Sequence, residues 1–205
     1  GIMAVVMIQY HHVLNKDMGY NPERIAVEYQ YCDNYETSQA VKNFYQGLPY
    51  VEDVTSAQDT SPLWGYSGEM MYDESGKSLF STKYDYMDED YIKMMGIGVK
   101  QGRVPRERGE VAANETWLKT RGWSAEQAIG QTIQTEEGKV KIVGIIQDFQ
   151  IGNFFNENQP FLMHYNPTFN GMIHLRLKEP FAENLQRLNK EAGEAFPGQT
   201  IEFES

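Results

Sequence analysis

The sequence predicts an α+β fold: a split βαβ, ferredoxin-like unit built from both ends of the chain, with a mixed α/β subdomain inserted between its halves. Residues 24–57 carry the pattern of a strand, a helix and a strand, and residues 171–204 repeat that order. Between them, residues 139–149 form an almost continuous apolar run, typical of a strand buried on both faces. Two such units at the ends of one chain favour a shared sheet.

The chain begins with a short apolar run, residues 2–8, which turns polar without any Pro or Gly before Gly19. We therefore predict a helix over residues 2–18, with Gly19 as its C-cap. The run is too short to cross a bilayer, and it lacks the basic flank and the cleavage site of a signal peptide. We interpret it as the last two turns of a transmembrane helix that continues into a polar stalk.

The N-terminal βαβ pattern follows this segment. Residues 24–31 alternate apolar and polar side chains, which predicts a half-buried strand. Residues 35–48 place apolar side chains at helical spacing until Pro49 ends the helix. Residues 51–57 then alternate again and are predicted to be the second strand.

The C-terminal end repeats the pattern. Residues 171–178 alternate as a strand, and Pro180 opens a helix that extends to residue 196. The predicted buried stripe of this helix consists of Phe181, Leu185, Leu188, Ala192 and Ala195. After a turn, residues 200–204 form the last alternating strand.

The middle of the chain alternates short strands and helices. Turn residues at 73–76 predict a hairpin whose second strand is 80–86. Acidic residues open a helix at 88–96, and Asn114 is a suitable N-cap for a helix that follows a strand within 110–123. The remaining predicted strands are 139–149 and 159–165.

The composition is that of a globular protein and excludes several classes of function. Hydrophobic residues make up 40% and charged residues 23% of the 205 positions, and the formal net charge is −11. Because nucleic acids and anionic lipids are bound through clustered cations, this acidic balance argues against both. Cys32 is the only cysteine, which excludes an intrachain disulfide and a cysteine-rich metal site.

Two glycine-containing stretches resemble nucleotide loops only superficially. "SGKS" at 75–78 lacks the glycine that a phosphate-binding loop needs five residues before Gly76, where Met71 stands, and it lies in a predicted hairpin turn. "GIGVKQG" at 96–102 has the wrong spacing for a dinucleotide loop and follows a helix. We interpret the second stretch as a loop after a helix.

Catalytic and metal-binding patterns are also incomplete. Ser67 in "GYSGE" lacks the final glycine of a nucleophile elbow and has no evident histidine partner. The four histidines do not have zinc-ligand spacing: His11 and His12 diverge on the predicted helix, and His164 and His174 lie on predicted strands.

The densest acidic group and one sequon also have structural interpretations. Asp85, Asp88, Glu89 and Asp90 lack the glycine and ligand rhythm of a calcium loop and suit a helix N-terminus. "NET" at Asn114 matches a glycosylation sequon, a pattern with many chance occurrences. We predict no catalytic residue, no cofactor site and no metal site, and therefore a protein that is not an enzyme.

Four stretches occur in a fixed order: residues 14–27, 88–103, 111–133 and 139–160. Their distinctive residues are Lys16, Asp17, Met18, Gly19, Tyr20, Asp90, Tyr91, Gly96, Gly102 and Arg103. In this order they resemble the MacB-like (FtsX-like) ABC transporter permeases, in the form common in Bacteroidetes. Val104 departs from the pattern, since the family more often has phenylalanine after the glycine–arginine turn.

The resemblance implies a periplasmic core domain that lies between the first and second transmembrane helices. Residues 1–18 would be the end of the first transmembrane helix and its stalk. Residues 19–83 and 166–205 would form a porter-like βαβ subdomain. Residues 84–165 would form the inserted, Sabre-like subdomain.

The implied function is that of an extracytoplasmic, non-catalytic domain of an ABC transporter permease at the periplasmic face of the bacterial inner membrane. It would couple cytoplasmic ATP hydrolysis to efflux or other periplasmic work, by transmitting motion. The implied partners are a second permease copy or paralogue and a cytoplasmic ABC ATPase. A periplasmic adaptor and an outer-membrane exit protein are further candidates. The membrane would be reached through helices outside this sequence.

Two other classes of function stay open. One is a free-standing, ferredoxin-like module that binds a small molecule, and the other is a hydrolase whose catalytic residues follow none of the patterns above. Gene context separates them: a neighbouring ATPase and a reading frame that extends into four membrane spans favour the transporter. A stop codon directly after Ser205 favours the free-standing module.

Overall fold

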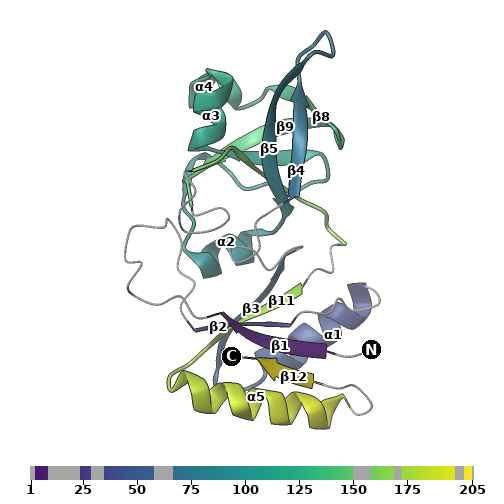
Figure 1. Ribbon diagram of the computed structural model, residues 1–205, viewed down its shortest axis with the longest axis vertical. Coiled ribbons are helices and arrows are strands. Elements are labelled where there is room, and N and C mark those ends of the chain that lie inside the picture. The colour runs from purple at the N-terminus through teal and green to yellow at the C-terminus, as the bar shows by residue number, and fades with distance from the viewer. Residues whose placement is uncertain are drawn as a thin grey trace. The chain divides into compact units, whose positions relative to one another are not determined.

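The computed structural model describes residues 3–8, 24–28, 35–57, 67–149, 158–168, 172–196 and 201–204. These residues form two compact units (Figure 1). The terminal unit contains the described residues up to Ala57 and those from Met172 onwards, and the central unit contains those between Ser67 and Thr168. The chain therefore has the predicted α+β class, with a central part inserted between two terminal halves.

The terminal unit is built on a five-stranded sheet in the order β12–β1–β2–β11–β3. Its elements are β1 (Met3–Ile8), β2 (Ile25–Glu28), α1 (Tyr35–Gln46), β3 (Val51–Ala57), β11 (Met172–Leu177), α5 (Phe181–Ala195) and β12 (Ile201–Glu204). Strands β2 and β3 are both antiparallel to β11, which lies between them. The unit β2–α1–β3 is therefore a split βαβ, as predicted.

The second βαβ unit, β11–α5–β12, is split more widely, because both β1 and β2 lie between its parallel strands. The prediction that the strands near residues 24–31 and 172–178 share one sheet is confirmed. They are direct neighbours, with Ala26 opposite Leu175.

Strand β1 corrects the prediction of a helix over residues 2–18. Met3–Ile8 pairs in parallel with β12 and in antiparallel with β2, so the helix prediction is wrong for these residues. Residues 9–18 lie outside the described part of the chain. A short apolar run has no period that separates a helix from a strand, and β-branched Val5, Val6 and Ile8 suit a strand with partners on both sides. The interpretation of this run as the end of a transmembrane helix required a helix, and the structure has a strand there.

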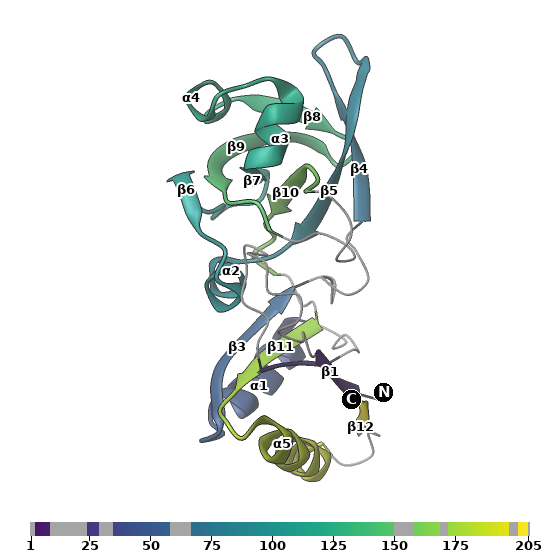
Figure 2. The ribbon, with the colours of Figure 1, turned by 60° about the vertical axis from the view of Figure 1, so that its left-hand side comes forward.

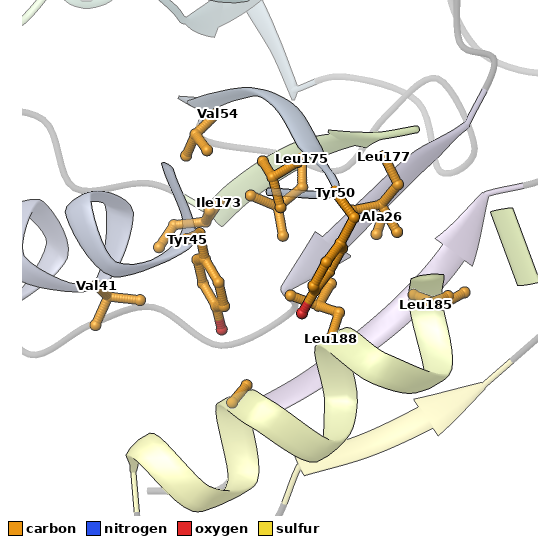
Figure 3. Close-up of a cluster of buried hydrophobic side chains, with 12 residues drawn as sticks. Ala26, Val41, Tyr45, Tyr50, Val54, Ile173, Leu175, Leu177, Leu185 and Leu188 are labelled. Atoms are coloured by element: carbon orange, nitrogen blue, oxygen red, sulfur yellow. The ribbon is translucent and has the colours of Figure 1, made fainter. Parts of the chain in front are cut away.

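Both helices of the terminal unit contribute to one apolar cluster with the sheet (Figure 3). Val41 and Tyr45 come from α1, and Leu185 and Leu188 from α5. They meet the side chains of alternate β11 residues, Ile173, Leu175 and Leu177. On the opposite face of β11, His174 and Arg176 are also buried, although the alternation predicted exposed polar side chains there.

The central unit is a mixed seven-stranded sheet in the order β6–β9–β7–β10–β5–β4–β8 (Figure 2). A further pairing between β8 and β9 closes six of these strands into a ring. Its elements are β4 (Ser67–Tyr72), β5 (Ser78–Tyr86), α2 (Glu89–Met95), β6 (Val99–Gly102), β7 (Glu110–Asn114), α3 (Glu115–Arg121), α4 (Ala125–Ala128), β8 (Thr132–Thr135), β9 (Gly138–Ile146) and β10 (Phe161–His164). Helix α3 packs against the sheet through the buried Trp117 and Leu118.

The predicted hairpin, the helix near 88–96, the strand-to-helix segment with its Asn114 cap, and the strands near 139–149 and 159–165 are all present. The boundary of the insertion differs from the predicted one. Strand β4 and all of β5 belong to the central sheet, because β4 pairs with β8 and β5 pairs with β10. The predicted boundary instead placed residues 67–83 in the porter-like βαβ subdomain.

Strand β6 was predicted to be a loop. Its four side chains are all exposed, so no apolar alternation marks it in the sequence. It pairs with β9 where Gly102 adopts a positive φ of 71° and where an added Cβ on Gly144 would overlap the backbone of Arg103. Among the described helices, none combines the length and the apolar character needed to cross a bilayer.

Candidate functional site

A pocket of about 520 Å³ opens in the central unit. It is lined by the β4–β5 hairpin, the C-terminal end of α3 with Trp123, and parts of β8 and β9. The hairpin projects beyond the neighbouring strands in both ribbon views (Figure 1 and Figure 2). This volume lies within the range of small-molecule sites, so we take the pocket as the candidate site.

The tip of the hairpin is fixed by one carboxylate. Asp73 Oδ1 accepts hydrogen bonds from the backbone N–H groups of Ser75 and Lys77, both at 2.9 Å, and from the Ser75 hydroxyl at 2.7 Å. The Ser75 hydrogen bond is the main cause that lowers the pKa of Asp73 below its ordinary value. The "SGKS" stretch therefore forms a hairpin turn between two strands, as the sequence indicated, and not a phosphate-binding loop.

Trp123 lies on the apolar wall of the pocket, and Trp117 packs behind it. Trp117 is fully buried, and its ring lies 5.7 Å from Phe80 and 5.8 Å from the half-buried Trp123, between ring centroids. The guanidinium carbon of Arg121 lies 4.3 Å above the Trp123 ring, which is a cation–π distance. The indole N–H of Trp117 has no hydrogen-bond acceptor among the described residues.

Asn114 positions this wall. Its Oδ1 accepts from the backbone N–H groups of Trp117 at 2.9 Å and Phe161 at 3.0 Å, and its Nδ2 donates to the Gln159 carbonyl at 2.8 Å. The side chain thus caps α3 and ties it to the start of β10. Because Asn114 is fully buried and its amide is used, the sequon is not available for glycosylation in the folded protein.

The pocket also carries two basic side chains, Arg121 and Lys139. Neither forms an ion pair with any carboxylate of the described part of the chain. The acidic residues at the rim are Asp73, which is engaged in the turn, and Glu74, which is exposed. The lining therefore combines the partly exposed Trp123 and the exposed Leu79 with two cations and two carboxylates.

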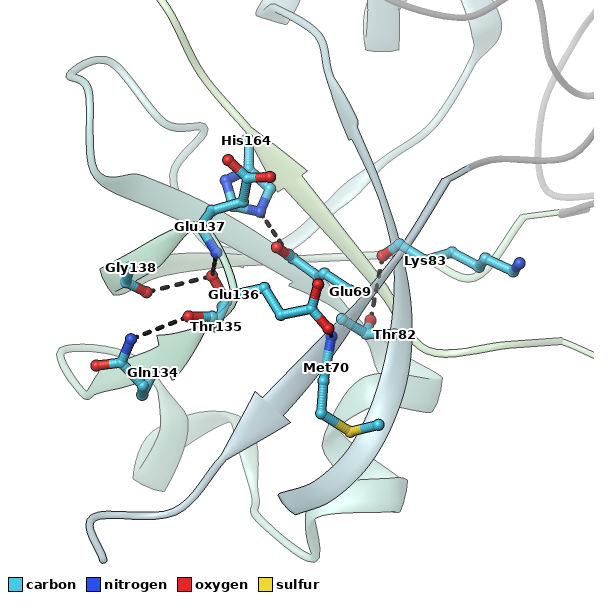
Figure 4. A network of polar contacts seen from close by, with 10 residues as sticks. All are labelled: Glu69, Met70, Thr82, Lys83, Gln134, Thr135, Glu136, Glu137, Gly138 and His164. Carbon is cyan, nitrogen blue, oxygen red and sulfur yellow. Dashed lines mark hydrogen bonds and ion pairs between the residues drawn. The ribbon is translucent and has the colours of Figure 1, made fainter. Parts of the chain in front are cut away.

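A second polar cluster lies elsewhere in the same unit, between β4 and β10 (Figure 4). His164 Nε2 lies 2.7 Å from Glu69 Oε1, and both side chains are buried. The rings of Tyr84 and Tyr86 lie 5.4 and 5.2 Å from the His164 ring. Nearby, the Glu137 N–H donates to Thr135 Oγ1, which orders the β8–β9 turn. The Glu69–His164 pair links β4 and β10. Among the described residues, no serine, threonine or cysteine side chain that could act as a nucleophile is hydrogen-bonded to this pair.

The structure does not bring the acidic group near residue 88 together as a cation site. Asp88 caps α2 by accepting from the Tyr91 N–H at 2.9 Å, and Glu89 pairs with Lys93 at 3.1 Å. Asp85 is buried in β5, whereas Asp90 is exposed. Over the described residues, no cluster of three or more His, Cys, Asp or Glu has the arrangement of a metal site.

The other residues considered from the sequence are also separated. Ser67 is the first residue of β4, and Gly96 is the C-cap of α2. His174 is buried in the terminal unit, with Nδ1 3.0 Å from the Met172 carbonyl oxygen. His11 and His12 lie outside the described residues. The pocket itself was not predicted, although two tryptophans six positions apart around "KTRG" are a signal for it.

No protein-family model matches the chain, and comparison with curated protein sequences finds no match. Solved structures are similar. A domain of a protein described as a permease from Porphyromonas gingivalis has a TM-score of 0.57 at 15% identity, over 86% of this chain and 85% of that one. The periplasmic region of MacB from Actinobacillus actinomycetemcomitans has a TM-score of 0.57 at 12% identity, over 89% of each chain.

The extracellular domain of YknZ, a noncanonic ABC-type transporter from Gram-positive bacteria, has a TM-score of 0.52 at 11% identity, over 94% of each chain. At these identities the similarity shows a shared fold. The resemblance to MacB-like permease domains that the sequence predicted is thus confirmed for the fold, in both the split βαβ part and the insertion.

Proposed function

We propose that this chain is the extracytoplasmic domain of an ABC transporter permease at the periplasmic face of a bacterial inner membrane. One observation carries the proposal: three domains described as parts of permeases or ABC-type transporters share its fold over 86–94% of its length. A match of that extent includes residues of the inserted unit as well as of the split βαβ unit.

The subdomain assignment is part of the proposal. The terminal unit corresponds to the porter-like subdomain, and the central unit, beginning with β4, corresponds to the Sabre-like one. The domain does no chemistry of its own and transmits motion that ATP hydrolysis drives on the cytoplasmic side. Its partners are a second permease copy or paralogue and the ATPase, with an adaptor and an exit protein where the work is efflux.

The pairing of β1 with β12 supports a role in transmission. Met3 lies opposite Ile201 and Val6 opposite Glu204, so the two chain ends enter one sheet as hydrogen-bonded neighbours. Adjacent strands are about 4.8 Å apart, and a displacement of one is passed directly to the other through the ladder.

The proposal is tested in cells that express the whole reading frame together with its ATPase. With Cys32→Ser as background, Lys119→Cys places a thiol at an exposed position of α3. A membrane-impermeant maleimide is expected to label this thiol in intact spheroplasts, while a cysteine placed in the ATPase is labelled only after lysis. Labelling of residue 119 only after lysis, or recovery of the protein in the soluble fraction, contradicts the proposal and favours a free-standing module.

A further inference from the structure

We infer that the β1–β12 pair is a mechanical clamp: a force that separates the two ends of the chain loads the hydrogen bonds of this pair in shear, all at once. The inference concerns how the terminal unit responds to force. It goes beyond the proposed function and holds whether or not the domain belongs to a permease. It rests on three features: the direction of the two strands, the contacts that hold them, and the place of the central unit in the chain.

The first feature is that the two strands run in the same direction. β1 and β12 are parallel, with Met3 opposite Ile201 and Val6 opposite Glu204. The chain therefore enters the ladder at its Met3–Ile201 end and leaves it at its Val6–Glu204 end. Pulling these two points apart slides the strands past each other along their own axes. Because the bonds of a parallel ladder are evenly spaced along the strands, the four register pairs share the load.

The second feature is that each strand is held by further contacts. β1 also pairs in antiparallel with β2, where Ile8 lies opposite Ile25. β12 follows α5, whose Leu185 and Leu188 are fully buried in the core of the terminal unit. In the sheet order β12 has β1 as its one strand neighbour. A load between the chain ends therefore crosses the β1–β12 ladder before it reaches any other strand pair of the described sheet.

The third feature is that the central unit is an insertion. Along the chain β3 precedes its described residues and β11 follows them. These two strands pair with each other in the terminal sheet, with Thr55 opposite His174. A force between the chain ends is therefore borne within the terminal sheet. It stretches the central unit only after β3 and β11 have separated.

The test compares two pulling directions in one protein by single-molecule force spectroscopy. The 205-residue chain carries Cys32→Ser and Glu52→Cys, and Glu52 is an exposed residue of β3. In one arm the handles are attached to the two chain ends, and in the other to residue 52 and the C-terminal end. The protein is the same in both arms, so its equilibrium stability is the same, whereas forced unfolding reports the barrier along the pulled direction.

The second arm pulls across the strands. β3 and β12 are the two edges of the terminal sheet. Asp53, next to residue 52, lies in one row of register partners with Arg176, Ile25 and Ile8, two positions along β1 from the partner of Glu204. This pull opens an edge strand one pair at a time. At equal loading rate we expect the end-to-end unfolding force to be about two- to fourfold higher, because four pairs then resist together.

Two outcomes of this comparison overturn the inference. One is an end-to-end unfolding force that is equal to or lower than the force across the sheet. The other is a first end-to-end event whose gain in length corresponds to unfolding of the central unit while the terminal unit stays folded.

A matched pair of variants tests the ladder itself. Proline has no backbone N–H, and neighbouring N–H groups of a strand point to opposite sides. Of Glu202→Pro and Phe203→Pro on β12, one therefore removes a bond to β1 and the other removes a donor at the open edge. We expect the end-to-end unfolding force to fall about twofold in one variant and to stay near the parent value in the other. A fall in neither variant, or an equal fall in both, contradicts the clamp.

Discussion

Glu110 holds the segment between β6 and β7 in place. Its carboxylate oxygens accept from Arg103 Nη1 and Nη2 at 2.9 and 2.5 Å, and Oε1 also accepts from the backbone N–H groups of Arg106 and Glu107. These contacts, the Arg103 hydrogen bond first, lower the pKa of Glu110 from 4.5 to about 2. Because the folded-state pKa is depressed, the contribution is complete above pH 4.5 and is lost as pH falls towards 2.

Glu110→Gln is therefore expected to lower the free energy of unfolding at pH 7 by about 1 kcal/mol, the range for a partly exposed ion pair with added hydrogen bonds. At pH 3 the difference in unfolding free energy between wild type and variant should be smaller. This pH lies below the ordinary pKa of 4.5, so part of the stability that the ionised Glu110 carboxylate contributes is already lost. Urea denaturation at both pH values checks this. Glu194→Gln, an exposed position on α5, is the control, and an equal loss at pH 3 and pH 7 would argue against the assigned role.

His174 acts in a different pH range. Burial lowers its pKa from 6.5 to about 4, although the hydrogen bond to the Met172 carbonyl opposes the shift. The unfolded chain therefore binds a proton between pH 6.5 and 4 that the folded chain does not, so stability falls as pH falls through that window. His174→Asn is expected to flatten this part of the pH profile, measured as the difference in urea midpoint between pH 7 and pH 5. An unchanged difference would show that His174 is accessible to protons in the fold.

At the scale of an element, α3 depends on its cap. Asn114→Ala removes the acceptor for the Trp117 and Phe161 N–H groups and the donor to Gln159. The expected loss is about 2–3 kcal/mol, more than the ~1 kcal/mol typical of a cap alone, because buried partners are left unpaired. Ser124→Ala in the exposed capping box of α4 is the matched comparison and should cost about 1 kcal/mol in urea denaturation. Equal losses would mean that Asn114 acts only as a cap.

The elements that the sequence predicted are those with a clear local signal. Strand β9 has its apolar run, α5 has its apolar stripe, and Asn114 has a cap position before Trp117. Strand β6 has no such signal, because its four side chains are exposed and only its pairing with β9 makes it a strand. The pocket was not predicted for a related reason. Its lining comes from the β4–β5 hairpin, α3, β8 and β9, and the pairing of β8 with β4 and β9 brings these segments to one place only in the folded sheet.

At the scale of the whole molecule, the arrangement of the terminal sheet could be predicted only in part. The split βαβ pattern correctly placed β2 and β11 in one sheet, and the structure adds that they are direct neighbours. It gave no position to β1, because an apolar run of six residues is compatible with a helix end and with an interior strand. The choice between helix and strand depends on pairing partners almost two hundred positions away, at residues 201–204.

Deleting residues 3–8 separates these two interpretations. In the structure β1 lies between β12 and β2, so its removal leaves both neighbours without a ladder and detaches β12 from the rest of the sheet. We expect the terminal unit to lose several kcal/mol of stability, on the order of the whole stability of a small domain, and β12 amides to lose hydrogen-exchange protection. Deleting residues 201–204 instead removes an edge strand and should cost less. If the chain without residues 3–8 melts at the wild-type temperature, the run is no part of the sheet, and the end of a membrane helix becomes the better interpretation.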